Sequence, residues 1–449
     1  MTEGFLEEFV LMCSVVKWAV LASLTGAVIG FGVAFFLKAV QWAVGFGADV
    51  PWRILALPIG GLLTGWLVYR FAPDAEGHGT EQVICSIHQR CGRVKAAVVP
   101  VKLLATVVTL GVGGSAGKEG PAAQIGSGIA SLISDFMHLS DADRRKLAVC
   151  GISAGFASVF GLPMAGSIFG IEVLMVGGMF YEFLFPSFLA GITAYEIVHW
   201  LGVSYETYTM SIPVLHEALL LKVVAMGMLI GLISMVFIEV MKAFHNLFHR
   251  IRVAAPWRPF IGGIILVPCA LLIGRQYLGL STDLLHSALS GAQVSSLAWL
   301  WKIIFVSITL GSGFSGGVIT PIFVIGATAG SMLGSIFGLP APVAAAMGMV
   351  GLVAGTANTP VAAVIMGFEM FGPGFGIYSA AVCIMSYLMV GHRSIYPSQI
   401  LFACKSQSMQ VETMVPLSDL HPSLTTGAVH RIERFRRAFH LPTAHQHHA

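Results

Sequence analysis

An uninterrupted run of 66 residues, Ile303 to Phe368, contains no Asp, Glu, Lys, Arg or His. A run of this length is sufficient for about three passes through the hydrocarbon layer of a bilayer. Charged residues make up only 10% of the 449-residue chain, against roughly 25% in soluble domains. Apolar residues make up 56%, enough with the glycines for about fifteen spanning helices. The sequence therefore predicts an all-α polytopic membrane protein and excludes a soluble enzyme.

The two ends of the chain indicate its orientation in the membrane. The first twelve residues include Glu3, Glu7 and Glu8 but no basic side chain, so they do not resemble a cleaved secretory signal. The tail from residue 405 carries more basic than acidic residues, and positive charge favours the cytoplasmic side. We therefore expect an integral protein of the plasma (inner) membrane with a cytoplasmic tail that holds no regulatory domain.

The apolar segments are short and interrupted by Gly and Pro, as in transporters built from broken helices. Two of these interruptions match each other. Residues 109–126 and 309–326 are identical at nine of eighteen positions with a constant offset of 200. Each stretch leads into a helix predicted to begin near a proline, Pro121 or Pro321. The match indicates a duplicated unit.

A second match supports the duplication. Small residues at 151–157 recur at 351–357, and Glu172 with its apolar neighbours recurs at Glu369. Repeats of this kind predict a pseudo-two-fold molecule with its site near the membrane midplane, and these matches alone leave parallel and inverted repeats both open. The predicted organisation is a short N-terminal segment (1–12), a first transmembrane repeat (13–205), a second transmembrane repeat (206–404) and a polar tail (405–449).

Glycines precede both of the predicted helix starts. The strings there fit the dinucleotide pattern GxGxxG or GxGxxA, but they lie in a charge-poor membrane segment without the βαβ unit that this pattern requires. Backbone N–H groups at a helix start bind anions, and within a bilayer free N–H groups are tolerated only where they line a cavity or meet a ligand. Two such starts predict one small-anion site. The alternative is that the glycines only permit close helix packing.

Glu119 is predicted to lie in the first turn of one of these helices, beside Lys118 and within an apolar region. An intramembrane carboxylate is a functional candidate by default. The N–H groups that stabilise its charge would equally stabilise an anion, so the two compete for one place. Protonation of Glu119 would free that place and link anion passage to pH. The alternative is a carboxylate that only caps its helix.

These residues resemble the motifs of the CLC family of chloride channels and chloride/proton antiporters, and the resemblance covers nearly the whole chain. Residues 117–121, GKEGP, are similar to the family's G(K/R)EGP motif, whose glutamate is the gate. Residues 317–321 are similar to GxFxP, with Ile319 where Phe is usual. Residues 73–81 occupy the place of the GSGIP loop, and Tyr396 fits the tyrosine that contacts the central anion.

The resemblance implies two inverted repeats of short, tilted and broken helices, and a homodimer with one independent pore in each subunit. It implies a bound chloride ion, no other cofactor and no metal. His78 replaces the usual serine, and its ring either faces the pore, where it could titrate, or turns away. The gate would be Glu119, and the implied anion-binding residues are His78, Gly79, Lys118, Gly120, Val318, Ile319 and Tyr396.

Proton coupling is where the sequence departs from the antiporters. The position of their second, proton-relaying glutamate aligns with Val173, which cannot carry a proton. Glu172 beside it has a repeat partner and is interpreted as structural, with a relay through Glu172 or water as the alternative. We therefore expect channel-like or weakly proton-coupled transport of chloride or a similar small anion, with no nucleic acid partner. The alternatives are a fully coupled chloride/proton antiporter, a sodium-coupled carrier of an organic substrate, and a membrane protein that only binds or scaffolds.

Overall fold

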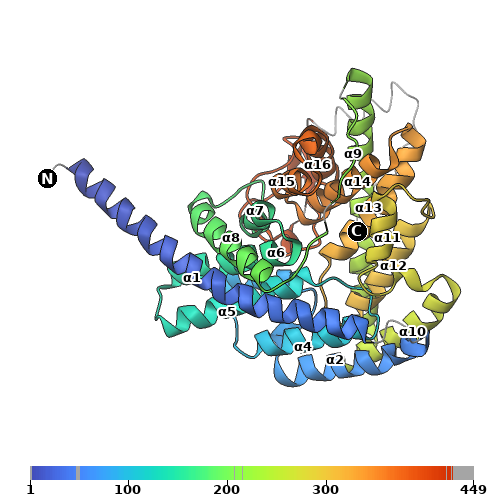
Figure 1. Ribbon diagram of the computed structural model, residues 1–449, viewed down its shortest axis with the longest axis horizontal. Coiled ribbons are helices and arrows are strands. Elements are labelled where there is room, and N and C mark those ends of the chain that lie inside the picture. The colour runs from blue at the N-terminus through green and yellow to red at the C-terminus, as the bar shows by residue number, and fades with distance from the viewer. Residues whose placement is uncertain are drawn as a thin grey trace.

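The computed structural model describes residues 3–46, 51–206, 208–214, 216–420, 422–425 and 427. Its regular structure there is almost entirely helical (Figure 1). The α-helices are α1 (Glu3–Gly45), α2 (Leu57–Phe71), α3 (Thr80–Gln89), α4 (Val98–Gly111), α5 (Glu119–Phe136), α6 (Asp141–Phe160), α7 (Pro163–Glu172), α8 (Leu184–Trp200), α9 (Glu217–Arg250), α10 (Arg258–Leu272), α11 (Thr282–Leu289), α12 (Ala298–Gly311), α13 (Ile319–Phe337), α14 (Ala341–Ala357), α15 (Pro360–Phe371) and α16 (Gly376–Met389). The strands are β1 (Met175–Val176), β2 (Ile400–Leu401), β3 (Met409–Gln410) and β4 (Ser423–Leu424).

The first eight helices correspond in order to the last eight. Each half begins with its longest helix, α1 or α9, which packs on the last helix of its own half, α8 or α16. The helices that follow the two glycine-rich stretches pack in the same way, α5 on α6 and α13 on α14. Corresponding helices also contact each other between the halves, as α2 contacts α10 and α7 contacts α15. The duplication predicted from the sequence is therefore a duplication of structure.

The two repeats are inverted with respect to each other. Gly117 and Gly317, which match at the offset of 200, form an antiparallel bridge. Each N–H donates to the other's carbonyl, at 2.7 Å from Gly117 and 2.6 Å from Gly317. A reciprocal antiparallel pair of equivalent residues is what a two-fold axis between them produces, because the axis reverses the chain direction. The predicted fold class, with inverted repeats and broken helices, is confirmed.

The repeat also relates two buried ammonium groups. Lys102 of α4 and Lys302 of α12 are both fully buried. The Lys102 Nζ donates to the carbonyl of Gly77 at 2.5 Å, and the Lys302 Nζ donates to the carbonyl of Gly279 at 3.1 Å. Both glycines have a positive φ, which an L side chain rarely adopts. The lysines therefore hold two symmetric loops.

Glu172 and Glu369, the matched acidic pair, each cap the N-terminus of a helix in the other repeat. Glu172 at the end of α7 accepts hydrogen bonds of 3.0 and 2.7 Å from the N–H groups of the second and third residues of α15. Glu369 in α15 accepts bonds of 3.0 and 2.7 Å from the equivalent N–H groups of α7. Carboxylates are favourable at helix N-termini because they satisfy free N–H groups and complement the dipole.

Removing either cap is expected to destabilise the protein by a similar amount. Glu172→Ala and Glu369→Ala should each lower the free energy of unfolding by about 1–2 kcal/mol, since each leaves two N–H groups at a helix start without their carboxylate partner. Thermal unfolding in detergent would measure this as a lower Tm. Glu182→Ala is the control, because the Glu182 side chain is 64% exposed and its ion pair with Lys146 is long, at 3.7 Å. A loss in only one of the two variants would contradict the symmetric interpretation.

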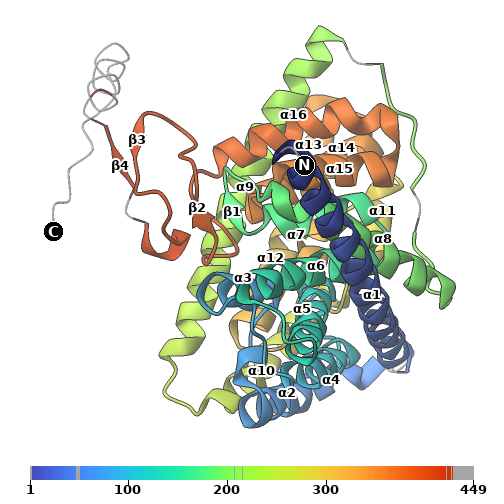
Figure 2. The same ribbon diagram turned by 90° about the vertical axis from the view of Figure 1, so that its left-hand side faces the viewer.

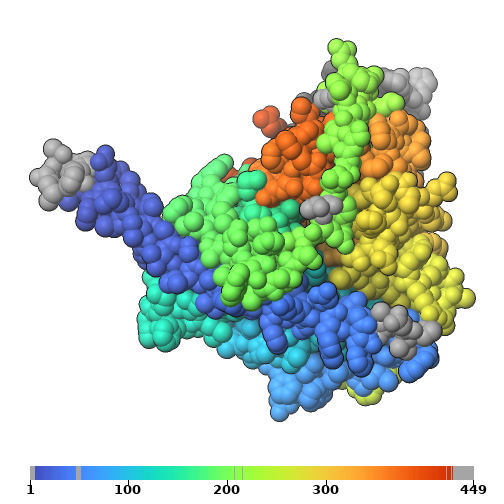
Figure 3. All heavy atoms as spheres, viewed as in Figure 1, coloured from blue at the N-terminus to red at the C-terminus, as the bar shows by residue number. Residues whose placement is uncertain are grey.

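The surface shows the composition of a membrane protein. Within the described residues, five stretches are long and apolar enough to cross a bilayer: Leu6–Gly45, Trp52–Phe71, Glu217–Arg250, Ala255–Leu272 and Ile319–Phe337. Other apolar helices, including α4, α12 and α15, have only 10 to 17 residues, as predicted for broken helices. Large apolar side chains are exposed on the outer helices, such as Phe35 of α1 and Ile59 of α2. The N-terminal part of α1 projects from the body as an arm (Figure 3).

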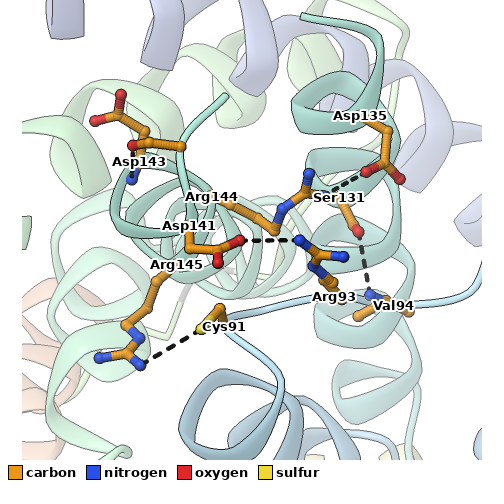
Figure 4. Close-up of polar contacts among 10 residues, drawn as sticks. Cys91, Arg93, Val94, Ser131, Asp135, Asp141, Asp143, Arg144 and Arg145 are labelled. Atoms are coloured by element: carbon orange, nitrogen blue, oxygen red, sulfur yellow. Dashed lines mark hydrogen bonds and ion pairs between the residues drawn. The ribbon is translucent and has the colours of Figure 1, made fainter. Parts of the chain in front are cut away.

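Charged residues gather at the junction of α5 and α6 (Figure 4). The Arg144 guanidinium lies 2.6 Å from the Asp135 carboxylate, and the Arg93 guanidinium lies 3.0 Å from Asp141. The side chains of Arg93 and Asp141 are more than half exposed, so they suit the polar boundary of a membrane better than its interior.

The chain after α16 returns to the first repeat before it leaves the body. β2 pairs in parallel with β1, which follows α7. This pairing fixes the irregular segment 395–399 against the protein interior. The β3–β4 hairpin then lies outside the helical body (Figure 2). The last part of the predicted polar tail, residues 428–449, lies outside the described residues.

Candidate functional site

The carboxylate of Glu119 lies between the N-termini of α5 and α13, one helix from each repeat. Its Oε2 accepts hydrogen bonds from the backbone N–H of Lys118 and from the backbone N–H of Thr320, both at 3.1 Å. Its Oε1 accepts a hydrogen bond from the Thr320 hydroxyl. The residue is fully buried. A negative charge is thus held by donors from both halves of the molecule, as helix N-termini favour.

The backbone at these helix starts follows from the motifs. α5 begins at Glu119 and α13 at Ile319, as the positions of Pro121 and Pro321 predict. Val318 is the N-cap residue of α13, and both it and Ile319 are buried. The first N–H groups of a helix have no partner within it. The structure therefore places the backbone of Val318 and Ile319 beside the donors that hold Glu119.

The loop between α2 and α3 packs with its backbone directly against the start of α5. A Cβ on Gly120 would lie 1.9 Å from the carbonyl oxygen of His78. A Cβ on Gly79, whose φ is +86°, would lie 2.5 Å from the carbonyl oxygen of Gly120. Only glycine allows both approaches. The predicted residues His78, Gly79 and Gly120 are therefore brought together, next to Glu119.

Tyr396 lies on the other side of His78. Their ring centroids are 5.4 Å apart, so the His78 ring is directed toward Tyr396. The Tyr396 hydroxyl and His78 Nδ1 are both buried and without a hydrogen-bond partner among the described residues. Buried polar atoms are rarely left unpaired. A water or an anion is the type of partner that both atoms require.

Two side chains hold the loop that carries Tyr396. Gln399 donates to the carbonyl of Val173 at 2.9 Å and to that of Ala357 at 2.8 Å. Ser398 donates to Glu81, which lies in α3. The Val173 side chain is fully buried and has no ionisable group. The site thus extends from Glu119 through the loop at His78 to Tyr396.

The remaining predicted residue, Lys118, contributes through its backbone. Its N–H holds Glu119, whereas its ammonium takes part in none of the ion pairs within the described ranges. Together with the buried Lys102 and Lys302, Lys118 gives this interior basic side chains, which favour an anion. No cluster of three or more His, Cys, Asp or Glu side chains suited to a metal occurs in the described part of the chain.

Sequence analysis missed Thr320 and Glu81. Thr320 occupies the position in the second repeat that Gly120 occupies in the first, so the repeat alignment was the available signal for it. Glu81 lies within the loop motif that was already recognised, but its partner Ser398 is 317 residues away. No local pattern indicates such a contact.

This arrangement of inverted repeats, broken helices and facing helix N-termini defines an integral membrane protein for anion transport. Residues 60–391 match the family described as voltage gated chloride channel. The chain belongs to this family, the CLC proteins. Its members are membrane channels and transporters and not enzymes.

Individual relatives agree with this assignment. The chain is 36% identical over 404 residues to the chloride/fluoride channel protein of Pseudomonas syringae pv. tomato, covering 88% of each chain. It is 29% identical over 367 residues to the voltage-gated ClC-type chloride channel ClcB of Salmonella typhimurium, covering 77% of this chain and 87% of that protein. The crystal structure of a CLC-type fluoride/proton antiporter superposes with a TM-score of 0.82 at 29% identity, covering 86% of this chain and 98% of the other. None of these supports the sodium-coupled alternative.

Proposed function

We propose that the chain conducts a small anion, chloride in the first place, through a pore between its two repeats, with Glu119 as the gate. The observation that carries this proposal is that the Glu119 carboxylate accepts hydrogen bonds from the N–H groups of Lys118 and Thr320. These donors are the kind that replace the hydration shell of an anion. As long as the carboxylate occupies them, an anion has no place there.

Opening follows from protonation of the gate. A neutral carboxyl group binds N–H donors far more weakly than a carboxylate does, because the bonds are no longer charge-assisted. Glu119 then leaves the helix N-termini, and an anion takes its place. The unpartnered Tyr396 hydroxyl donates to an anion further along the pore, with Gly79 and Gly120 keeping the backbone close and His78 beside it.

The proposed transport is channel-like or weakly coupled to protons. Val173 has no group to relay a proton, and both oxygens of Glu172 are engaged at the start of α15. A fully coupled antiporter is the second candidate. It is favoured by the structural neighbour described as a fluoride/proton antiporter.

The proposal includes the surroundings of the pore. Chloride is the bound ion, and no other cofactor is required. The subunit assembles as a homodimer in the bilayer of the plasma (inner) membrane, with the tail from residue 405 in the cytoplasm. Fluoride is the second anion to be tested, because the Pseudomonas relative is named as a chloride/fluoride channel.

Anion efflux from liposomes that contain the purified protein tests the proposal. External pH is recorded while a chloride or a fluoride gradient is imposed. We expect efflux that rises as pH falls, with little or no proton movement driven against its own gradient. Stoichiometric proton movement would indicate the coupled antiporter. Efflux no faster than from protein-free liposomes, for both anions, would exclude the proposed function.

A further inference from the structure

A buried carboxylate beside Tyr396 has no role in the transport steps described so far. Glu81 is the second residue of α3. Its Oε1 accepts a hydrogen bond from the N–H of Ser398 at 3.0 Å and another from the Ser398 hydroxyl at 2.5 Å. Its Oε2 is buried and has no partner in the part of the chain that is described. Ser398 lies two residues after Tyr396, so Glu81 is bound to the segment that carries the pore tyrosine.

Three other buried polar atoms near Glu81 also lack a partner among the described residues: His78 Nδ1, Thr80 Oγ1 and Tyr396 Oη. Thr80 Oγ1 lies 3.3 Å from the point where a Cβ on Gly120 would be, one residue from the gate. Four unpaired polar atoms in one place are unusual, since each costs free energy when it is buried without a partner. They place unpaired polar atoms between Glu81 and the start of α5, where the gate lies.

The other carboxylates close to these unpaired atoms are already engaged. Both oxygens of Glu172 accept from α15, and both oxygens of Glu369 accept from α7. Val173, which aligns with the proton-relaying glutamate of the CLC antiporters, is apolar. Glu81 is therefore the carboxylate next to Tyr396 with an oxygen free to carry a proton, within the described ranges.

We propose that Glu81 is the proton-exchange group on the Tyr396 side of the pore, which gives this chain a weak proton pathway in the absence of a glutamate at Val173. The inference rests on the proposed function. Protonated Glu81 gives its Oε2 proton to the Tyr396 hydroxyl or to a water bound there, and that group passes its own proton toward Glu119. Glu81 becomes a carboxylate, Glu119 becomes a carboxylic acid, and only O–H bonds form and break.

The charged and titratable groups on the elements around Glu81 are compatible with this step. His78 and Tyr396 flank it from the two loops, and Glu119 accepts the proton at the start of α5. Lys102 of α4 donates to the Gly77 carbonyl at 2.5 Å, four residues before Glu81.

The test compares Glu81→Gln with the wild type in liposomes, with chloride efflux and proton uptake recorded together. Glutamine keeps an oxygen that accepts from Ser398, so the loop stays anchored, but it exchanges no proton. The ratio of protons to anions should fall at least about tenfold, as for loss of a positioned acid–base group. Glu182→Gln is the matched control, because it also replaces a glutamate by glutamine but at a side chain that is 64% exposed and lies outside the site. Its ratio should match the wild type.

Four results would count against the proposal. An unchanged ratio in Glu81→Gln, or anion efflux from the wild type without any proton movement, would overturn the role of Glu81 and leave the proposed function standing. Absence of anion efflux from the wild type would overturn the proposed function itself. If Glu81→Gln does not fold, Glu81→Asp replaces it. The infrared band of a protonated carboxyl group in the wild type should then shift in Glu81→Asp, and a band that stays in place would refute the proposal.

Discussion

Glu119→Gln is expected to abolish the pH dependence of anion efflux. Glutamine cannot ionise, so it never becomes the charged competitor for the N–H groups of Lys118 and Thr320. Wild-type efflux should rise as pH falls, because protonation removes the charge that holds the gate on these donors. The variant should conduct at a constant, high rate across the same pH range. Efflux from liposomes at a series of pH values measures both.

Thr320→Val tests the hydrogen bond from the Thr320 hydroxyl to the gate carboxylate. It removes the hydroxyl donor to Glu119 but keeps the Thr320 N–H and the ionisable carboxylate. A hydrogen bond to a charged group contributes about 1.5–3 kcal/mol, so efflux at neutral pH should rise about tenfold or more while its pH dependence persists. If Glu119→Gln retained the pH dependence of the wild type, the assignment of the gate would be wrong.

The helix starts at the site could be predicted because their signals are local. Glycines followed by Pro121 or Pro321 mark the place where a helix begins, and the offset of 200 between the two stretches indicates that both belong to one type of unit. The structure begins α5 at Glu119 and α13 at Ile319. Composition also sufficed to predict a membrane-spanning helical protein, because long apolar runs must satisfy their backbone within the helix in lipid.

The contacts that join distant parts of the chain could not be predicted. Thr320 reaches Glu119 across 201 residues because the two-fold axis brings the starts of α5 and α13 together. The matched pair Glu172 and Glu369 was interpreted as structural, but the sequence does not show that each caps the other's repeat. Such contacts depend on the inverted arrangement, and the sequence matches that show the duplication are equally compatible with parallel repeats.

Inversion also explains why equivalent positions diverge. Gly120 and Thr320 occupy the same place in their repeats, but only Gly120 faces the loop that carries His78. Thr320 instead faces Glu119 and supplies a donor to it. The gate carboxylate itself exists in one repeat only, because Ile319 stands at the matching position. Duplication thus supplies two helix N-termini for one anion, and divergence supplies one gate.

Gly120→Ala is expected to abolish transport. The alanine Cβ would lie 1.9 Å from the His78 carbonyl oxygen. Rotation of a side chain cannot remove this clash, because the oxygen is a backbone atom and the Cβ is fixed to the backbone. The loop must move, and the free energy of unfolding should fall by about 3 kcal/mol or more. A displacement of about 1 Å at a site can lower its rate about a hundredfold. Efflux assays and thermal unfolding in detergent would record the two effects separately.

Gly376→Ala provides the matched control for this substitution. Gly376 also lies at the start of a helix, α16, but a Cβ there would meet only the Phe368 ring at 3.6 Å, an ordinary contact. Its Tm and efflux should equal those of the wild type. Wild-type efflux from Gly120→Ala would mean that the loop can withdraw from α5 without loss, so that His78 and Gly79 are not part of the pore. Loss of efflux in a folded Gly120→Ala protein would show that anion passage requires the close approach of these two backbones.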